Sequence, residues 1–267
     1  MALRINSNVD AMAAHRHLAQ TSDKISQAME RLSSGLRINK AADDAAGLGI
    51  SEKMRAQIRG LAQAQRNIQD SVSMVQTAEG NLDEVHSILQ RVRELAVQYK
   101  NGSTSTAGQQ AIQSEVDQLK AEIDRIGESA VFNGVHLLDS SSSSVTFQVG
   151  ANDGETIVVS FADLSAAVGT AYTNLSTASL SDIDDAIDAV TSLRSGFGAV
   201  QNRLEHALAV TGVYQENLTS AESRIRDVDM AEEMVELTKN QILQQAGTAM
   251  LAQANQAPQS VLNLLRQ

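Results

Sequence analysis

Apolar side chains recur in alternating steps of four and three residues along most of this chain. This spacing places them on one stripe of an α-helix and is typical of helices that pair along a narrow seam. The first stripe comprises Leu18, Ile25, Met29, Leu32 and Leu36. The last comprises Leu243, Gly247, Met250, Ala254, Ala257, Val261 and Leu264. Further helical stripes lie between them, so we expect a mainly α fold built from long helices.

Composition supports this expectation and excludes several classes of site. The 267 residues include one proline, no cysteine and only 3% aromatic residues, so the buried area must come from aliphatic side chains and alanine. The lack of cysteine excludes a disulfide framework and a thiolate metal site. A net charge of -11 argues against nucleic acid as a partner. No apolar run approaches the ~20 residues of a membrane span, and charged residues interrupt the apolar segment that a secretory signal would need.

In the middle of the chain the helical pattern gives way to a pattern typical of strands. VTFQV (145–149) and TIVVSF (156–161) are rich in β-branched and aromatic residues, and GANDGE separates them. This arrangement predicts a β-hairpin. The helical period resumes near Ser181, which together with Asp184 resembles a capping box.

The order of these patterns is nearly symmetric: short helix, long helix, hairpin, long helix, short helix. We therefore expect a long antiparallel helical bundle or coiled coil with a small β-hairpin, in which the chain ends return side by side. The expected parts are residues 1–43 with 227–267 as one coiled-coil layer, 44–139 with 181–226 as a second helical bundle, and 140–180 as a surface hairpin and loop region.

A glycine-containing stretch, RLSSGLRINKAADDAAGLGIS (31–51), separates the first stripe from the long helix that follows. Gly35, Gly47 and Gly49 predict a hinge between two helices, because glycine tolerates backbone conformations that other residues avoid. The symmetric layout predicts a counterpart of this hinge near residues 226–229.

No residue pattern indicates catalysis. His15 and His17 are two positions apart, so on a helix they point to different faces. The GLG and GFG segments lack the preceding strand and the third glycine of a dinucleotide-binding motif. We therefore expect no enzymatic activity, no catalytic residue, no metal and no cofactor.

The terminal stripes are broader than one partner helix can cover. Two helices without aromatic residues, joined through a glycine hinge, are expected to be marginally stable by themselves. Identical copies are the simplest additional partners, and a heterologous contact that does not close produces a helical polymer. An ordinary bundle core is the alternative explanation of these stripes.

Several longer stretches resemble those of a known family. They are MALRINSNVDAM (1–12), ERLSSGLRINKAADDAAGLGIS (30–51), LQRVRELAVQ (89–98), FNGVHLL (132–138) and QANQAPQSVLNLLRQ (253–267). In order and along the whole length they resemble bacterial flagellin, in a short form that lacks large outer domains.

The resemblance implies a secreted, extracellular structural subunit that self-assembles into the helical flagellar filament for motility. The terminal segments would pair in an inner tube and be disordered in the free subunit, with polymerisation resting on the two terminal stripes. Residues 31–51 would connect this inner tube to an outer tube made by the longer helices. The implied partners are further copies, the flagellar export apparatus, an export chaperone at the C-terminal segment, and hook-associated and cap proteins.

The resemblance also implies recognition by a vertebrate Toll-like receptor. The matching positions are Gln90, Arg91, Glu94, Leu95, Gln98 and Glu115. A packing role is the alternative, because Arg91 and Glu94 have the spacing of a helical ion pair and Leu95 falls between core and surface.

Two other functions are compatible with the sequence. A hook–filament junction protein would share the terminal motifs but would cap a polymer instead of extending it. A secreted coiled-coil effector or adhesin would bind a host partner as a monomer.

Overall fold

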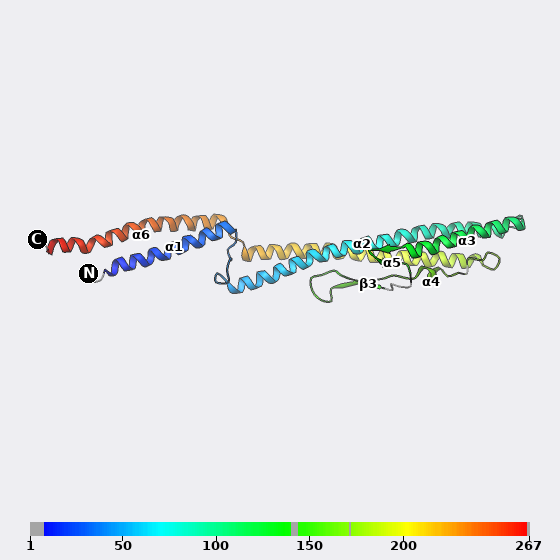
Figure 1. Cartoon of the computed structure of the whole chain (residues 1–267), viewed down its shortest axis with the longest axis horizontal. Coiled ribbons are helices and arrows are strands. Elements are labelled where there is room, and N and C mark those ends of the chain that lie inside the picture. Colours follow the sequence, from blue (N-terminus) through cyan, green and yellow to red (C-terminus); the bar gives the residue numbers. More distant parts are fainter. Residues whose placement is uncertain (1–7, 140–143, 171, 266–267) are drawn as a thin grey trace. The chain divides into compact units, whose positions relative to one another are not determined.

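The computed structural model describes residues 8–139, 144–170 and 172–265, with side chains described as far as residue 256. The helices are α1 (Val9–Ser34), α2 (Ala45–Tyr99), α3 (Thr106–Ser129), α4 (Leu164–Val168), α5 (Leu180–Arg226) and α6 (Met230–Leu265) (Figure 1). The strands are β1 (Val131–Phe132), β2 (Val135–His136), β3 (Ser144–Gln148) and β4 (Thr156–Ser160). These elements confirm the mainly α fold. Within the described ranges, no helix combines the length and apolarity needed to cross a membrane.

The chain divides into two compact units. The terminal unit contains residues 1–55 and 218–267, and the central unit contains residues 56–217. The terminal unit therefore includes the start of α2 and the end of α5 as well as the two chain ends. The borders expected near residues 43 and 227 fall inside it.

In the terminal unit, α1 and α6 lie side by side and run antiparallel (Figure 1). Asn8 caps the start of α1 by accepting a hydrogen bond from the Ala11 amide, and its own amide donates to the Ala254 carbonyl at 2.8 Å. At the other end of α1, Arg31 lies 3.6 Å from Glu233 of α6. The return of the chain ends to one place is thus confirmed.

Residues 35–44 connect α1 to α2 and are held by the connection between α5 and α6. Gly35 ends α1 in the left-handed conformation, with φ of 72°, which glycine adopts without steric penalty. Its carbonyl accepts a hydrogen bond from the Val228 amide, and Leu36 forms an isolated antiparallel bridge with Asp227. The counterpart expected near residues 226–229 is therefore present and directly bonded to the first connection.

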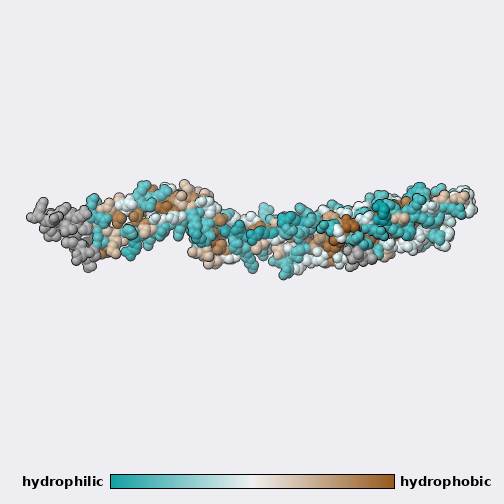
Figure 2. All heavy atoms as spheres, viewed as in Figure 1, coloured by the Kyte–Doolittle hydropathy of each residue, from teal (hydrophilic) through white to brown (hydrophobic). Residues whose placement is uncertain are grey.

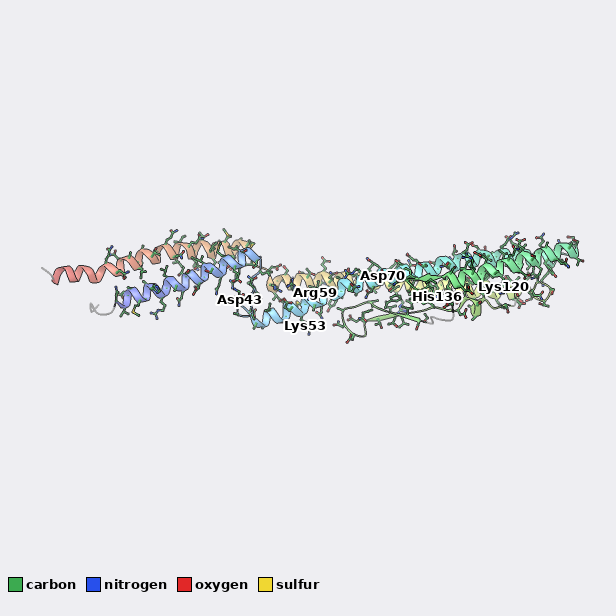
Figure 3. The ribbon with its side chains drawn as sticks, in the orientation of Figure 1. Asp43, Lys53, Arg59, Asp70, Lys120 and His136 are labelled. Atoms are coloured by element: carbon green, nitrogen blue, oxygen red, sulfur yellow. The ribbon has the colours of Figure 1, made fainter. Side chains whose placement is uncertain are left out.

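Asp43 organises the same connection locally (Figure 3). Its Oδ2 accepts hydrogen bonds from the Asn39 and Lys40 amides at 3.0 and 2.9 Å. These two bonds, chiefly the one from the Lys40 amide, lower the pKa of the Asp43 carboxyl below its usual range. The segment is a hydrogen-bonded turn and not an open link.

Gly47 and Gly49 lie inside the first turns of α2, which begins at Ala45 and not near Ser51. The Gly47 amide donates to Asp44 Oδ1 at 2.8 Å, so Asp44 satisfies one of the free amides at the helix start. A methyl group on Gly47 would lie 2.4 Å from Asp44 Oδ2 and 2.8 Å from the Ile38 side chain. Gly47 is therefore closely packed by the Asp44 and Ile38 side chains inside a helix, whereas the expected role was a hinge.

In the central unit, the apolar stripe of α2 forms the core with α3 and α5. The stripe residues Ala78, Leu82, Val85, Leu89, Val92 and Ala96 are fully buried. Ile112, Val116, Ile123 and Ile126 of α3, and Ile183, Val190, Phe197 and Leu204 of α5, are buried with them. The four-three spacing in these segments therefore marks a true interior face.

The predicted hairpin is formed by β3 and β4, which pair with Phe147 opposite Ile157. Strand β4 alternates as expected for a half-buried strand: Ile157 and Val159 are buried, while Val158 is 49% exposed. The Asn67 amide of α2 donates to the Gln148 carbonyl and holds the hairpin against the helix.

The sequence reading did not include the short hairpin of β1 and β2 or helix α4. Asn133 and Gly134 form the turn of the short hairpin, with φ values of 49° and 80°. An Asn-Gly pair with two positive φ angles is the usual two-residue hairpin turn, so the signal was present in FNGVHLL.

The start of α5 also differs from the expectation. The capping pair is Ser179 with Asp182, and not Ser181 with Asp184. Asp182 Oδ2 accepts from the Ser179 amide at 2.7 Å, and the Asp182 amide donates to Ser179 Oγ at 3.1 Å. These bonds lower the pKa of the Asp182 carboxyl. Asp184 instead binds Arg93 of α2, with 2.6 Å between Oδ1 and Nε.

Candidate self-assembly surface

The seam between α1 and α6 is narrow, and small or polar residues occupy two of its most buried positions. Ala28 of α1 and Asn240 of α6 are each 2% exposed, and Leu237 is 7% exposed. A methyl group on Gly247 would lie 3.4 Å from Leu18 Cδ1, so the two helices approach closely there. Such a seam buries less apolar area than one lined by leucine throughout.

A second apolar row lies on the opposite side of α6. It contains Val235, Ile242 and Ala249, which recur every seven residues, and the first two are 69% and 60% exposed. Val235 and Ala249 each lie two positions before a residue on the α1 side of the helix, namely Leu237 and Leu251. Two positions correspond to about 200° around an α-helix. The row therefore faces away from α1, and we call it the outward row.

Other exposed apolar side chains flank this row and extend onto α1. On α6 they are Met230, Met234, Leu243 and Met250, and on α1 they are Val9, Met12 and Met29, each at least 49% exposed. Brown and tan atoms on α1 and α6 mark this apolar surface in Figure 2. The paired helices thus leave uncovered apolar surface on both partners, beyond the single exposed residues that any protein carries.

The predicted polymerisation residues separate into two groups. Leu18, Ile25, Leu32 and Ala254 are half-buried, as expected on the side where α1 and α6 meet, whereas Met29, Leu243 and Met250 are exposed. Leu36 belongs to the bridge with Asp227. The side chains of Val261 and Leu264 lie outside the described residues. The outward row itself was not singled out from the sequence, although its seven-residue spacing could have identified it.

The predicted receptor positions lie in the central unit, on α2 and α3. Arg91 binds Glu94 on its own helix and Glu115 on α3, with a nitrogen–oxygen distance of 3.0 Å in each pair. These bonds, chiefly the one to Glu115, raise the pKa of the Arg91 guanidinium. Gln90, Arg91, Glu94 and Gln98 are exposed and form one ridge of α2.

Leu95 does not belong to that exposed ridge. It is 2% exposed and lies in the core of the central unit. The sequence placed Leu95 between core and surface, and this expectation is wrong because the side chain packs inside the subunit.

Carboxylates line one cavity of the central unit, and two of them have structural roles. A cavity of about 290 Å³ is lined by Lys120, Asp124 and Asp163 among other residues. Lys120 binds Asp124 at 2.6 Å, and Asp163 caps α4 (Figure 3 labels Lys120). Among the residues that the structure describes, no group of three His, Asp or Glu side chains is arranged to hold a metal ion.

Two profiles of known helical regions match the N-terminal and C-terminal parts of this chain. The profile of the bacterial flagellin N-terminal helical region matches residues 5–143, and that of the bacterial flagellin C-terminal helical region matches residues 180–265. The chain belongs to the bacterial flagellin family. It is 55% identical to a flagellin of Halalkalibacterium halodurans, over 98% of this chain and 99% of that protein. As a member of this family it is a structural subunit of the flagellar filament, in a short form.

Further flagellins and solved structures agree with this assignment. A Bacillus subtilis flagellin is 47% identical over 99% of this chain and all of that protein. The crystal structure of Bacillus cereus flagellin has a TM-score of 0.50 and 31% identity, and covers 54% of this chain and 88% of that chain. A flagellar hook-associated protein of Vibrio parahaemolyticus has a TM-score of 0.59 at 15% identity, covering 69% of this chain and all of that chain. The last comparison concerns the fold alone.

Proposed function

We propose that copies of this flagellin polymerise by burying the outward row of α6 and its flanking residues against neighbouring terminal units. The observation that supports this most directly is the exposure of Val235 and Ile242, two large aliphatic side chains on the side of α6 opposite α1. In this proposal the contact is heterologous, so contacts between copies repeat head to tail and extend a helical filament.

Assembly would be stabilised by burying apolar side chains that the single subunit leaves exposed. Full burial of one large aliphatic side chain is worth roughly 1.5–3 kcal/mol. The seam between α1 and α6 offers only part of this, because Ala28, Asn240 and Gly247 occupy positions in it and Leu18, Ile25 and Leu32 are only half-buried. We therefore propose that the helical ends, residues 1–43 and 227–267, gain most of their stability on assembly and are disordered in the free subunit, which is folding coupled to binding.

In this proposal residues 31–51 join an inner tube, made by α1 and α6, to an outer tube made by the longer helices. Gly35 ends α1 in the left-handed conformation, and the bonds to residues 225–228 hold the connection that follows it. Gly47 and Gly49 contribute as helix residues of α2 and not as joints.

The remaining partners follow from the same role. We propose secretion to the cell exterior through the flagellar export apparatus, with an export chaperone holding the C-terminal segment until assembly. Hook-associated and cap proteins would contact the two ends of the polymer. One flagellar hook-associated protein, that of Vibrio parahaemolyticus, shares the fold.

Assembly of the purified chain tests the proposal and separates it from its rivals. The monomer, salted out or seeded, should grow micrometre-long fibres visible by negative-stain electron microscopy, with a gain in helical far-UV circular dichroism. A hook–filament junction protein would cap seeds without extending them. A monomeric effector or adhesin would have ordered ends, resistant to protease, and would form no fibre at any concentration.

A second proposed function is recognition by a vertebrate Toll-like receptor. It is supported by the exposed ridge of Gln90, Arg91, Glu94 and Gln98, with Glu115 beside it on α3. The ridge offers charged and amide groups, and the guanidinium of Arg91 is held by Glu115 across the helices and by Glu94 on its own helix. Preorganised polar groups of this kind suit recognition by a protein partner. Leu95 would act only by supporting the ridge from the core.

A further inference from the structure

All sulfur in this protein is thioether sulfur, because the chain has eight methionines and no cysteine. The side chains of seven methionines are described, and five of these are 49% to 68% exposed. The five are Met12, Met29, Met230, Met234 and Met250, and all belong to α1 or α6. Met54 is half-buried, and Met74 is 5% exposed in the core of the central unit.

This distribution is unusual for a residue that normally fills gaps in cores. The exposed methionines flank the outward row of α6 or lie on the surface of its partner α1. They therefore occupy the surface that, in the proposed function, becomes dry when copies assemble.

We propose that these five methionines form an oxidation site that controls the assembly competence of the free subunit, with a peroxide as the oxidant. The inference rests on the proposed function, because it assigns a consequence to modification of the same surface. Oxidation converts a flexible apolar side chain into a polar sulfoxide, which loses free energy when it is buried without hydrogen bonds.

The chemical step is a two-electron oxygen transfer. The methionine sulfur attacks one oxygen of hydrogen peroxide, a sulfur–oxygen bond forms and the oxygen–oxygen bond breaks. The sulfur is oxidised to the sulfoxide and the peroxide is reduced to water, with the proton passing between the two peroxide oxygens. No other oxidant or reductant is needed for this direction.

Accessibility decides which methionines react. In the folded chain, Met12 and Met250 expose 68% and 66% of their surface, whereas Met74 is enclosed by the central core. Disorder of the terminal helices before assembly would expose the five methionines further. In a filament that buries the terminal units, the exposed five are shielded as well. Oxidation should therefore act on subunits before assembly and spare those already incorporated.

The test compares free subunits with filaments after exposure to hydrogen peroxide. Peptide mass spectrometry should show oxygen addition at the five methionines of the free subunit well ahead of Met74, and slower addition at the same five in filaments. The critical concentration for polymerisation of the oxidised subunit should rise at least about tenfold, equivalent to the loss of one buried apolar side chain. Treatment with both methionine sulfoxide reductases should restore it.

A variant carrying leucine at all five positions provides the matched control, since leucine keeps the apolar surface but has no sulfur. It should polymerise equally well before and after peroxide treatment. Normal assembly of oxidised wild-type subunits, failure of the reductases to restore assembly, or peroxide sensitivity of the leucine variant would each overturn the inference. If untreated wild-type subunits never polymerise, the proposed function itself falls, and this inference with it.

Discussion

Leu36 and Asp227 form an antiparallel β-bridge between the segment that leaves α1 and the segment that enters α6. Next to it, the Arg37 amide donates to the Arg226 carbonyl at 2.7 Å. The Arg226 guanidinium also binds Glu52 at the start of α2, at 2.8 Å. The connection between α1 and α2 and the connection between α5 and α6 are thus bonded to each other, at one end of the α1–α6 pair.

Replacement of Ile242 by aspartate should block polymerisation. It places a charge in the outward row, and burying an unpaired carboxylate at an interface is strongly unfavourable. We expect the critical concentration to rise by more than about tenfold, since each factor of ten requires only ~1.4 kcal/mol. Sedimentation of polymer from monomer measures it.

Gln69→Asp is the control for this experiment, because Gln69 is also exposed but belongs to α2 in the central unit, outside the outward row and its flanking residues. It introduces the same charge and should polymerise nearly normally. Equal loss in both variants would point to net charge, and normal assembly of Ile242→Asp would remove the outward row from the interface. Thermal unfolding of the central unit should be unchanged in both.

Alanine substitutions at Gly47 and Gly49 should have opposite effects on stability. At Gly47 the new methyl group would displace Asp44 from its capping position, and loss of such a cap costs about 1 kcal/mol. At Gly49 nothing lies within 4 Å of the added methyl, so alanine should stabilise the helix by roughly 0.5–1 kcal/mol. Denaturant unfolding monitored by circular dichroism measures the stability of both variants. Destabilisation by Gly49→Ala would contradict this prediction and support a hinge at position 49.

Tyr172 should make stability fall in strongly alkaline solution. Burial, assisted by the Asp124 carboxylate, raises the pKa of the Tyr172 hydroxyl to about 12, against an ordinary value of 10.0. The folded state therefore holds this proton more tightly than the unfolded state. The stabilisation is complete below pH 10 and is lost between pH 10 and about pH 12, at about 1.4 kcal/mol for each pH unit.

Unfolding by denaturant across this pH range tests the assignment, with Tyr172→Phe as the control. The phenylalanine variant should lose less stability than the wild type between pH 10 and 12. Identical pH profiles for the two proteins would show that Tyr172 ionises as freely in the folded state as in the unfolded chain.

Arg91→Ala should reduce Toll-like receptor signalling more than it reduces thermal stability. Arg91 is exposed and its ion pairs are screened by solvent, so their removal should change the melting temperature little. Arg125→Ala is the matched control, because Arg125 forms a similar exposed pair with Glu122. A reporter-cell assay measures signalling; equal responses to both variants would favour a packing role for Arg91.

The sequence predicted the helices and the β3–β4 hairpin because each has a periodic apolar face that the fold buries. It could not decide which residues of α6 meet α1. Gly247 and Ala254 lie on the α1 side, but the same four-three pattern also included Leu243 and Met250, which are exposed. Two apolar stripes interleave on this helix, and only the position of the partner helix tells them apart.

Local signals were misread where a neighbouring residue could perform the same task. Ser179 and Ser181 both precede an aspartate by three positions, and the structure uses the first pair to cap α5. Gly47 was read as a joint because glycine is common at turns. Its actual constraint is the proximity of Ile38, a residue brought there by the turn that precedes α2.

The turn between β3 and β4 has a practical consequence. Gly154 adopts a φ of 86°, and the neighbouring Asp153 is exposed. The turn belongs to the central unit, while α1 and α6 belong to the terminal unit. A foreign peptide grafted between these two residues would leave the polymerising helices intact and would be displayed once per subunit, making the filament a multivalent scaffold whose copy number grows with its length.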